Sequence, residues 1–287
     1  MLLATVLPMV TTGCLSRLRR TIPIRPASVV MGSDAAQLVS RVNADYDAVN
    51  SLVATVLIQA SVSKVREGKA NDYTPIPGHI LLRKPGDLRV LGMVPVLHTN
   101  AFDMASDGTN FKLVIPSKNE AIVGTDTVTK KSPNTLENLR PFMFVDAMLV
   151  RPILPAEQVL LTTHTDTEED PSHKFLVERP EYDLTIVQPR PGSQILTPVR
   201  VIHFKRDNLL PYKQDFYNTE GTLEEQVIYG EYQQFGQNSF PGVITIRRPL
   251  DEYQIVLTIQ KLTLNEDLQD NQFKLEIPEG TAIQKLE

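Results

Sequence analysis

The chain has a single cysteine and no tryptophan among its 287 residues. One cysteine cannot form an intramolecular disulfide, so a hydrophobic core must stabilise the fold without covalent cross-links. A net charge of −5 and a pI near 5.6 leave no basic surface for phosphates, which argues against a nucleic-acid partner. After the N-terminus, no apolar run approaches the roughly 20 residues that a membrane-spanning helix needs. The longest candidate, residues 142–154, is interrupted by Asp146, Arg151 and Pro152.

Recognisable catalytic and cofactor motifs are also missing. There is no Gly-x-Ser-x-Gly elbow, no phosphate-binding glycine loop and no dinucleotide fingerprint. The five histidines lie at spacings that match no metal-ligand motif: His79, His98, His164, His173 and His203. Residues 164–173 are acidic and could hold a divalent cation weakly, but we interpret them as a solvated charged loop. The sequence therefore predicts no enzyme, no cofactor and no metal site.

The only cysteine, Cys14, follows a short apolar run and the small residues Thr12 and Gly13. This arrangement is typical of a bacterial lipoprotein signal, in which the cysteine becomes the lipidated N-terminus. We therefore predict a signal peptide at residues 1–14 and a lipid anchor on Cys14. Two other interpretations stay open: an ordinary cleaved signal, or a buried strand that contains an unremarkable thiol.

A tether and one large domain are expected after the signal. Residues 15–33 contain Pro23, Pro26 and Gly32 and keep no period, as in a linker. A helix is predicted to start near Asp34, with Ser33 as its cap, because apolar residues then recur at helical spacing. No shift in composition divides residues 34–287, so we predict a single domain there.

Alternating residues dominate the remainder of the chain. Leu52, Ala54, Val56, Ile58, Ala60 and Val62 fall on one face of a long predicted strand. About a dozen strands follow, joined by links too short for crossover helices, so neighbours should be antiparallel. Residues 130–156 interrupt this pattern with a predicted helix that begins near Ser132 and is shortened or kinked by Pro141. The tail at residues 273–280 alternates as in a strand and then ends in a turn.

The order of these segments resembles the LolA/LolB-like bacterial lipoprotein carriers. The residues that carry the resemblance are Val42-Asn43-Ala44-Asp45-Tyr46, Val49-Asn50-Ser51-Leu52 with Ala54, Arg83-Lys84-Pro85-Gly86-Asp87-Leu88-Arg89, Phe102-Asp103-Met104-Ala105-Ser106-Asp107-Gly108, Val114-Ile115-Pro116-Ser117-Lys118-Asn119, Leu264-Asn265, and Phe273-Lys274-Leu275-Glu276-Ile277-Pro278-Glu279-Gly280. Together they span most of the chain from residue 34 onward.

The resemblance implies a mostly β fold with some α structure. A strongly curved antiparallel sheet would form an unclosed half-barrel, and the N-terminal helix and a short helical insert would cover its concave face. That face would be apolar and would accept acyl chains of lipoproteins or of other amphiphiles. The resemblance also implies a place in the bacterial cell envelope, anchored by lipid in the outer membrane and facing the periplasm.

Two groups of residues are candidates for lipid contact. The first would line the cavity: Leu52, Ala54, Val56, Leu57, Ile58, Phe102, Phe142, Met143 and Met148. The second is an apolar loop that would insert into the membrane: Met93, Val94, Val96 and Leu97. For both groups, ordinary core packing explains the same pattern.

Two functions follow from this sequence. The first is a lipid-anchored envelope protein that binds acyl chains and assists the outer-membrane localisation of lipoproteins. The second is a structural or sensory lipoprotein that uses the same fold to bind an envelope protein partner, with its own side chains filling the cavity.

Overall fold

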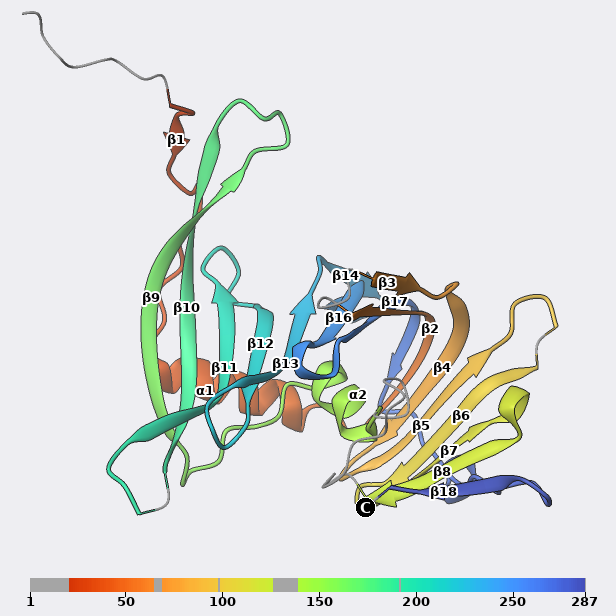
Figure 1. Cartoon of the computed structure of the whole chain (residues 1–287). Coiled ribbons are helices and arrows are strands. Elements are labelled where there is room, and N and C mark those ends of the chain that lie inside the picture. Colours follow the sequence, from red (N-terminus) through yellow and green to blue (C-terminus); the bar gives the residue numbers. More distant parts are fainter. Residues whose placement is uncertain (1–20, 65–68, 98, 126–138, 191, 287) are drawn as a thin grey trace, which may run out of the picture.

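The computed structural model describes residues 21–64, 69–97, 99–125, 139–190 and 192–286. These ranges contain eighteen strands and two α-helices (Figure 1). Their bounds are β1 Ile24–Arg25, α1 Ala35–Asp47, β2 Ser51–Lys64, β3 Lys69–Asp72, β4 Ile76–Arg83, β5 Asp87–Met93, β6 Asn100–Asp107, β7 Asn110–Ile115, β8 Glu120–Thr125, α2 Pro141–Met148, β9 Gln158–Glu169, β10 Leu176–Pro189, β11 Leu196–Lys205, β12 Pro211–Tyr217, β13 Leu223–Tyr229, β14 Tyr232–Phe235, β15 Asn238–Pro241, β16 Val243–Arg248, β17 Tyr253–Leu264 and β18 Ala282–Lys285.

Most of these strands form one large curved sheet that does not close into a barrel (Figure 1). Its order is β1-β10-β11-β12-β13-β16-β17-β2-β4-β5-β6-β7-β8-β18, with β3 paired to β2 and β9 paired to β10. β14 and β15 form a separate hairpin. The predicted fold class, an unclosed curved sheet with two helices, is confirmed. Strands joined by short links, from β4 to β8, pair in antiparallel fashion as expected. The sheet as a whole is mixed, because β1 joins β10, and β18 joins β8, in parallel.

β2 lies in the middle of the sheet, although it is the first long strand of the chain. It pairs with β4 on one side and with β17 on the other, where Leu52 lies opposite Leu264. Its even-numbered apolar residues from Leu52 to Ile58 are at most 5% exposed, and the intervening residues are partly exposed. The period of two thus places one face of β2 in the core, as the sequence predicts.

The cap of α1 lies one residue later than the predicted Ser33, and the helix begins at Ala35. The cap is Asp34, whose carboxylate accepts a hydrogen bond from the backbone N–H of Gln37, while the Gln37 side chain accepts one from the Asp34 N–H. The buried residues Leu38 and Val42 of α1 pack on β10 and β11 in a small hydrophobic cluster with Tyr182, Leu184, Ile186, Ile202 and Phe204.

α2 lies inside the curve of the sheet (Figure 1). Pro141 is its first residue, where the missing N–H and the fixed φ suit a helix start. The predicted helix therefore begins at the proline and is not kinked by it. Its predicted beginning at residues 132–138 lies outside the described residues.

The alternation at residues 273–280 does not produce a strand, although the turn expected at its end is present at residues 279–280. Residues 265–281, which we call the C-terminal strap, cross the face of the sheet opposite α2 without joining it, and β18 follows them. Ala105, Val114 and Ala121 of the sheet pack there against Leu275, while the neighbouring residues Met104, Leu113 and Ile122 point toward α2. We call the strap side the outer face and the α2 side the concave face.

The predicted tether is described from residue 21 onward. Within it, Ile24 and Arg25 pair with Leu176 and Val177 of β10, and the backbone N–H of Ser33 donates to the Tyr182 hydroxyl. This part of the chain therefore runs along β10. Cys14 and the predicted signal peptide lie outside the described residues. Among the described residues, neither helix has the length and apolar character to cross a bilayer.

Candidate lipid-binding face

The concave face is a continuous apolar surface covered by α2. Leu52, Ala54, Val56 and Ile58 of β2 join one hydrophobic core with Met143, Phe144, Ala147 and Met148 of α2. The alternation of β2 places Leu57 on the other face, where it is partly exposed and pairs with Thr258. Four of the five predicted β2 positions therefore lie together beneath the helix, and Leu57 does not.

Polar contacts hold α2 in place. The Tyr253 hydroxyl donates to the Met143 sulfur at 3.0 Å, and the Gln214 amide donates to the backbone oxygen of Asp146 at 3.3 Å. After the helix, the Asn43 side chain donates to the Ile153 carbonyl at 2.9 Å and accepts from the Ile153 N–H at 2.8 Å. α1 and the segment that follows α2 are thereby tied together.

A buried charge cluster lies at the N-terminal end of α2, beside Phe142. Arg248 donates to Asp251, Glu225 and Glu224 at 3.0, 3.0 and 3.1 Å. Burial raises the pKa of Glu225 to about 7, despite the attraction of Arg248. Phe142 is partly buried and lines a cavity of about 390 Å³ together with Glu225 and Arg248. This end of the helix is therefore polar, unlike the other end.

The C-terminal end of α2 borders a cavity of about 410 Å³ between the two helices, lined mainly by apolar side chains together with Arg41, Asp45 and the polar residues 237–239. Met148 lines it, together with Leu149 and Val150 after the helix and Val42 and Val49 around α1. The sheet and the β14–β15 hairpin complete the wall with aromatic side chains: Phe204, Tyr229, Tyr232 and Phe240. Its volume falls within the range of small-molecule pockets, about 300–1,000 Å³.

The connection between β5 and β6 carries the predicted membrane-contact residues. Met93 and Val94 are partly buried, whereas Val96 is 89% and Leu97 is 70% exposed. Val96 has a φ of 70°, rare for a β-branched residue, and the Leu97 N–H donates to the Pro95 carbonyl around it. The tip is thus a tight apolar turn that projects from one end of the sheet (upper right in Figure 1). Core packing accounts for Met93 and Val94 but not for Val96 and Leu97.

Phe102 lies at the base of this tip. It pairs with Gly92 across β5 and β6 and packs against the edge of the concave core. A Cβ on Gly92 would come within 2.4 Å of the Phe102 ring, so a glycine is required for the ring to lie flat there.

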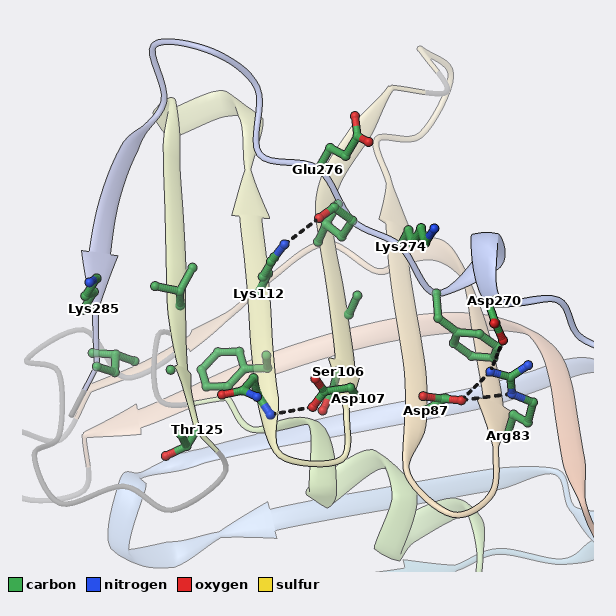
Figure 2. A pocket seen from close by; sticks show the side chains of 18 residues that line it. Arg83, Asp87, Ser106, Asp107, Lys112, Thr125, Asp270, Lys274, Glu276 and Lys285 are labelled. Atoms are coloured by element: carbon green, nitrogen blue, oxygen red, sulfur yellow. Dashed lines mark hydrogen bonds and ion pairs between the residues drawn. The ribbon is translucent and has the colours of Figure 1, made fainter.

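A cavity of about 950 Å³ separates the C-terminal strap from the outer face (Figure 2). Arg83 bridges Asp87 and Asp270 at its rim, and the Lys112 ammonium donates to the Leu275 carbonyl at 3.2 Å. Its lining mixes both charge signs with Phe111 and Phe273. Eight of its 18 lining residues are charged, compared with two of 20 in the interhelical cavity, so we place the lipid candidates on the concave face.

The outer face of β10–β12 carries a second polar cluster. Nδ1 of His203 lies 2.6 Å from Oδ1 of Asp183, and its Nε2 lies 3.0 Å from Oδ2 of Asp215. Burial lowers the pKa of His203, but the hydrogen bonds to Asp183 and Asp215 outweigh it, so the pKa is raised above its ordinary value. Carboxylates at both ring nitrogens favour an imidazolium.

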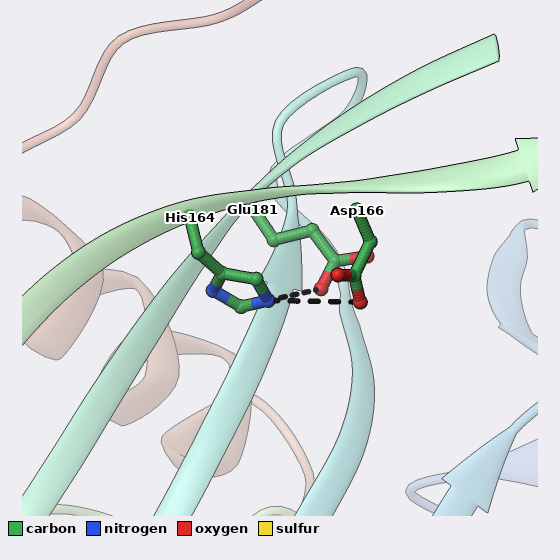
Figure 3. Close-up of side chains that lie close together, drawn as sticks. All are labelled: His164, Asp166 and Glu181. Carbon is green, nitrogen blue, oxygen red and sulfur yellow. Dashed lines mark ion pairs between the residues drawn. The ribbon is translucent and has the colours of Figure 1, made fainter.

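Next to this cluster, His164 approaches Asp166 and Glu181 on β9 and β10 (Figure 3). The interpretation of residues 164–169 as a loop is wrong, since they continue strand β9.

Known structures share this architecture. The chain aligns with a DUF1329 family protein from Desulfovibrio piger at a TM-score of 0.51 and 14% identity, over 84% of this chain and 95% of that one. It aligns with a LolA superfamily protein from Nitrosomonas europaea at a TM-score of 0.51 and 15% identity, over 85% and 99%. The chain has a LolA-like fold. No protein-family model matches its sequence, and no curated protein matches it significantly.

Within this LolA-like fold, the predicted residues fall into separate places. Met143 and the four inward residues of β2 lie in the core, Met148 lines the interhelical cavity, and Phe142 lies at the polar end of α2. Sequence reasoning missed Tyr229, Tyr232 and Phe240. These residues are far in the sequence from the helices that form the other walls of the cavity, so no local pattern links them to it. Their aromatic character was the available signal, since aromatic side chains are few in this chain.

Proposed function

We propose that this chain is a lipid-binding protein of the bacterial cell envelope that holds an acyl chain on the concave face of its LolA-like fold. The observation that carries the proposal is the mainly apolar cavity between α1 and α2, lined by Met148, Leu149, Tyr229 and Phe240. Each CH₂ group that leaves water there contributes about 0.8 kcal/mol. The proposed function needs no catalysis.

The tip between β5 and β6 supports a location at a membrane. Val96 and Leu97 expose apolar side chains to solvent at one end of the sheet. Exposed apolar tips of this kind gain free energy when they enter a lipid interface. A lipid on Cys14, the outer membrane as the site of anchoring and assistance in lipoprotein localisation belong to this proposal, and the resemblance to lipoprotein carriers supports them.

Lipid binding is tested at Phe240, which lies on the separate β14–β15 hairpin and not in the main sheet. Phe240→Asp places a charge in the cavity wall and should weaken binding of a fluorescent fatty acid at least tenfold. Phe240→Leu keeps the wall apolar and should bind within about threefold of the wild type. Native mass spectrometry of the purified protein should detect bound lipid in the wild type and Phe240→Leu. A wild-type protein that neither carries lipid nor binds the fatty acid would refute the proposal.

Membrane contact is tested with tryptophan, because the chain has none of its own. Leu97→Trp should show a blue-shifted emission when lipid vesicles are added. Leu160→Trp is the matched control, since Leu160 is 56% exposed on β9, at the other end of the sheet (Figure 1). Equal shifts for both variants, or no shift for Leu97→Trp, would exclude the tip as the contact.

A protein-interaction module is the second candidate. The observation that favours it is the filling of the concave face: α2 covers Leu52, Ala54 and Val56, which are fully buried. If the purified protein contains no lipid and retains an envelope protein through the same face, this second function is supported instead.

A further inference from the structure

We propose that His164, Asp166 and Glu181 form a binding site for a divalent transition metal, with zinc as the best fit, on the outer face of β9 and β10. The site is separate from the concave face and does not depend on the proposed lipid binding. One ligand atom from each of the three residues lies within 4.8 Å of the other two (Figure 3).

The distances match those of a zinc ligand set. Nε2 of His164 lies 3.2 Å from Oε2 of Glu181 and 3.9 Å from Oδ2 of Asp166. Ligands about 2.0–2.1 Å from a tetrahedral zinc ion are separated by roughly 3.3 Å. Small side-chain rotations of Asp166, which is 74% exposed, would bring the third ligand to that separation.

Two strands position these residues. His164 and Glu181 are direct partners in the antiparallel pairing of β9 with β10, and Asp166 follows two residues later on the same face of β9. Arg179 lies directly opposite Asp166 on that face and forms an ion pair with Glu168 at 2.9 Å. Two of the three ligands are thus fixed by the backbone register, which distinguishes this group from acidic residues gathered in a flexible loop.

Neighbouring side chains orient the ligands. Oδ2 of Asp183 lies 3.4 Å from Nδ1 of His164, so a carboxylate faces the ring nitrogen that the metal would not use. This carboxylate–histidine arrangement is the usual support of a metal-bound imidazole. The Tyr212 hydroxyl donates a hydrogen bond to Glu181 and fixes its carboxylate.

The burial of Glu181 favours a cation at this site. The Glu181 side chain is only 9% exposed, and among the described residues neither Lys nor Arg forms an ion pair with it. Asp166, Asp183 and Asp215 add three more carboxylates nearby. The positive groups near them are the imidazolium of His203 between Asp183 and Asp215, Lys213 at 3.6 Å from Asp215, and Arg179 opposite Asp166 in the strand pairing. A carboxylate that is nine-tenths buried requires a positive partner, because an unpaired buried charge is very costly.

The ligand types select the metal. An imidazole nitrogen favours zinc over magnesium or calcium, which prefer oxygen ligands throughout. His164 is 39% exposed, so the ion can enter from solvent and water can complete its coordination. The competing explanation is a protonated His164 that serves as the counter-ion of Glu181 and Asp183 without any metal.

Calorimetric titration of the metal-free full chain with zinc separates these explanations. The wild type should bind one zinc ion, and its melting temperature should rise with zinc. His164→Ala and Asp166→Asn should each weaken binding at least tenfold. Because both side chains are substantially exposed, both variants should remain folded, as circular dichroism would verify. His173→Ala is the matched control: His173 contacts Glu169 at 3.0 Å near the end of the same hairpin, outside the proposed ligand set, and its removal should change nothing.

Cobalt provides a second readout, because its visible absorption reports nitrogen ligation and tetrahedral geometry. We expect this absorption in the wild type and in His173→Ala and not in His164→Ala. The proposal is overturned if the wild type binds no zinc, if His164→Ala binds as tightly as the wild type, or if His203→Gln abolishes binding while His164→Ala does not.

Discussion

The two halves of the outer face of the sheet differ in what covers them. Over β4–β8 it is covered by the C-terminal strap, which packs Leu275 against Ala105, Val114 and Ala121. Over β10–β12 no described segment forms such a cover, and the same face carries His203 between Asp183 and Asp215. The outer face, which the helices do not contact, is therefore packed under an apolar segment in one half and carries a network of paired charges in the other.

The cover is held by side chains of the sheet and not by strand pairing. Arg89 donates to both carboxylate oxygens of Asp103 at 3.0 and 2.8 Å, and its remaining nitrogen donates to the strap carbonyls of Gln272 and Lys274. Lys112 donates to the carbonyl of Leu275. Since residues 272–275 of the strap form no backbone hydrogen bonds with a neighbouring strand, the Arg89 and Lys112 side chains provide the donors for three of their backbone carbonyl groups.

Among the described residues, the charged half has no apolar cover, and its buried groups pair with one another: the His203 side chain is 10% exposed and contacts Asp183 and Asp215. On this half His164 and Asp166 are 39% and 74% exposed, whereas the covered half is reached through cavities beneath the strap, one of which Figure 2 shows. Stability in the covered half should therefore depend on packing and on Arg89, whereas stability in the charged half should depend on pH.

The largest effect is expected for Arg89→Met. It leaves the Asp103 carboxylate, 6% exposed, without its bidentate partner and frees two strap carbonyls. We expect a loss of about 3 kcal/mol in the free energy of unfolding, measured by urea denaturation. The double variant Arg89→Met with Asp103→Leu should recover part of it, because no buried charge remains. A loss below about 1 kcal/mol for the single variant would mean that the strap is not held in this way.

Leu275→Ala should have the next largest effect. Leu275 is 9% exposed and is the strap residue of the apolar cluster on the outer face, so its truncation should cost about 2 kcal/mol. Ile283→Ala, at a residue that is 56% exposed on β18, serves as the control and should change stability by less than about 0.5 kcal/mol. Equal effects of the two changes would argue against the packed cover.

His203→Gln probes the charged half through pH. The raised pKa of His203 stabilises the fold fully below its unfolded value of about 6.5, and this contribution is lost as the pH rises through the folded pKa. Near pH 6 the substitution should cost about 1.5–2 kcal/mol, since two hydrogen bonds to carboxylates are lost. Toward pH 9 the wild type should weaken and the difference should shrink.

At acid pH the dependence of stability on pH is reversed: stability should fall as the pH decreases. Burial raises the pKa values of Asp183 and Asp215, but their interactions with His203 outweigh it, so both pKa values are lowered. Their contribution is present above about pH 3.9 and is lost as the pH falls through the folded pKa values. A wild-type stability that rises steadily from pH 6 to pH 9 would contradict the assignment of an imidazolium to His203.

Local periodicity explains what the sequence could predict. The alternation from Leu52 to Ile58 placed one face of β2 in the core, and the short turns predicted a meandering sheet. The segment between Met93 and Leu97 was expected as a candidate loop, and its tip is exposed. These features depend on neighbours within a few residues.

Long-range partners explain what it could not. Residues 273–280 alternate like a strand but belong to the strap. Arg89 and Lys112, more than 160 residues away in the sequence, donate hydrogen bonds to the carbonyl groups of Lys274 and Leu275, so these groups do not pair with another strand. His164 and Asp166 look like a charged loop because Glu181, the strand partner that completes their group, lies beyond the hairpin turn. The local sequence pattern around each segment gives no indication of these distant partners.

The smallest effect is expected for Arg179→Gln in the charged half. Arg179 forms an ion pair with Glu168 at 2.9 Å, but the two side chains are 42% and 63% exposed. Water and salt screen such a pair, so its loss should change the free energy of unfolding by less than about 0.5 kcal/mol at 0.15 M salt. The free energies of unfolding of Arg179→Gln and Arg89→Met should be measured by urea denaturation under the same conditions. The two variants are comparable because each removes an arginine that pairs with a carboxylate on a neighbouring strand. A comparable loss in both variants would show that the charged half is covered in solution, and the contrast between the two halves would then disappear.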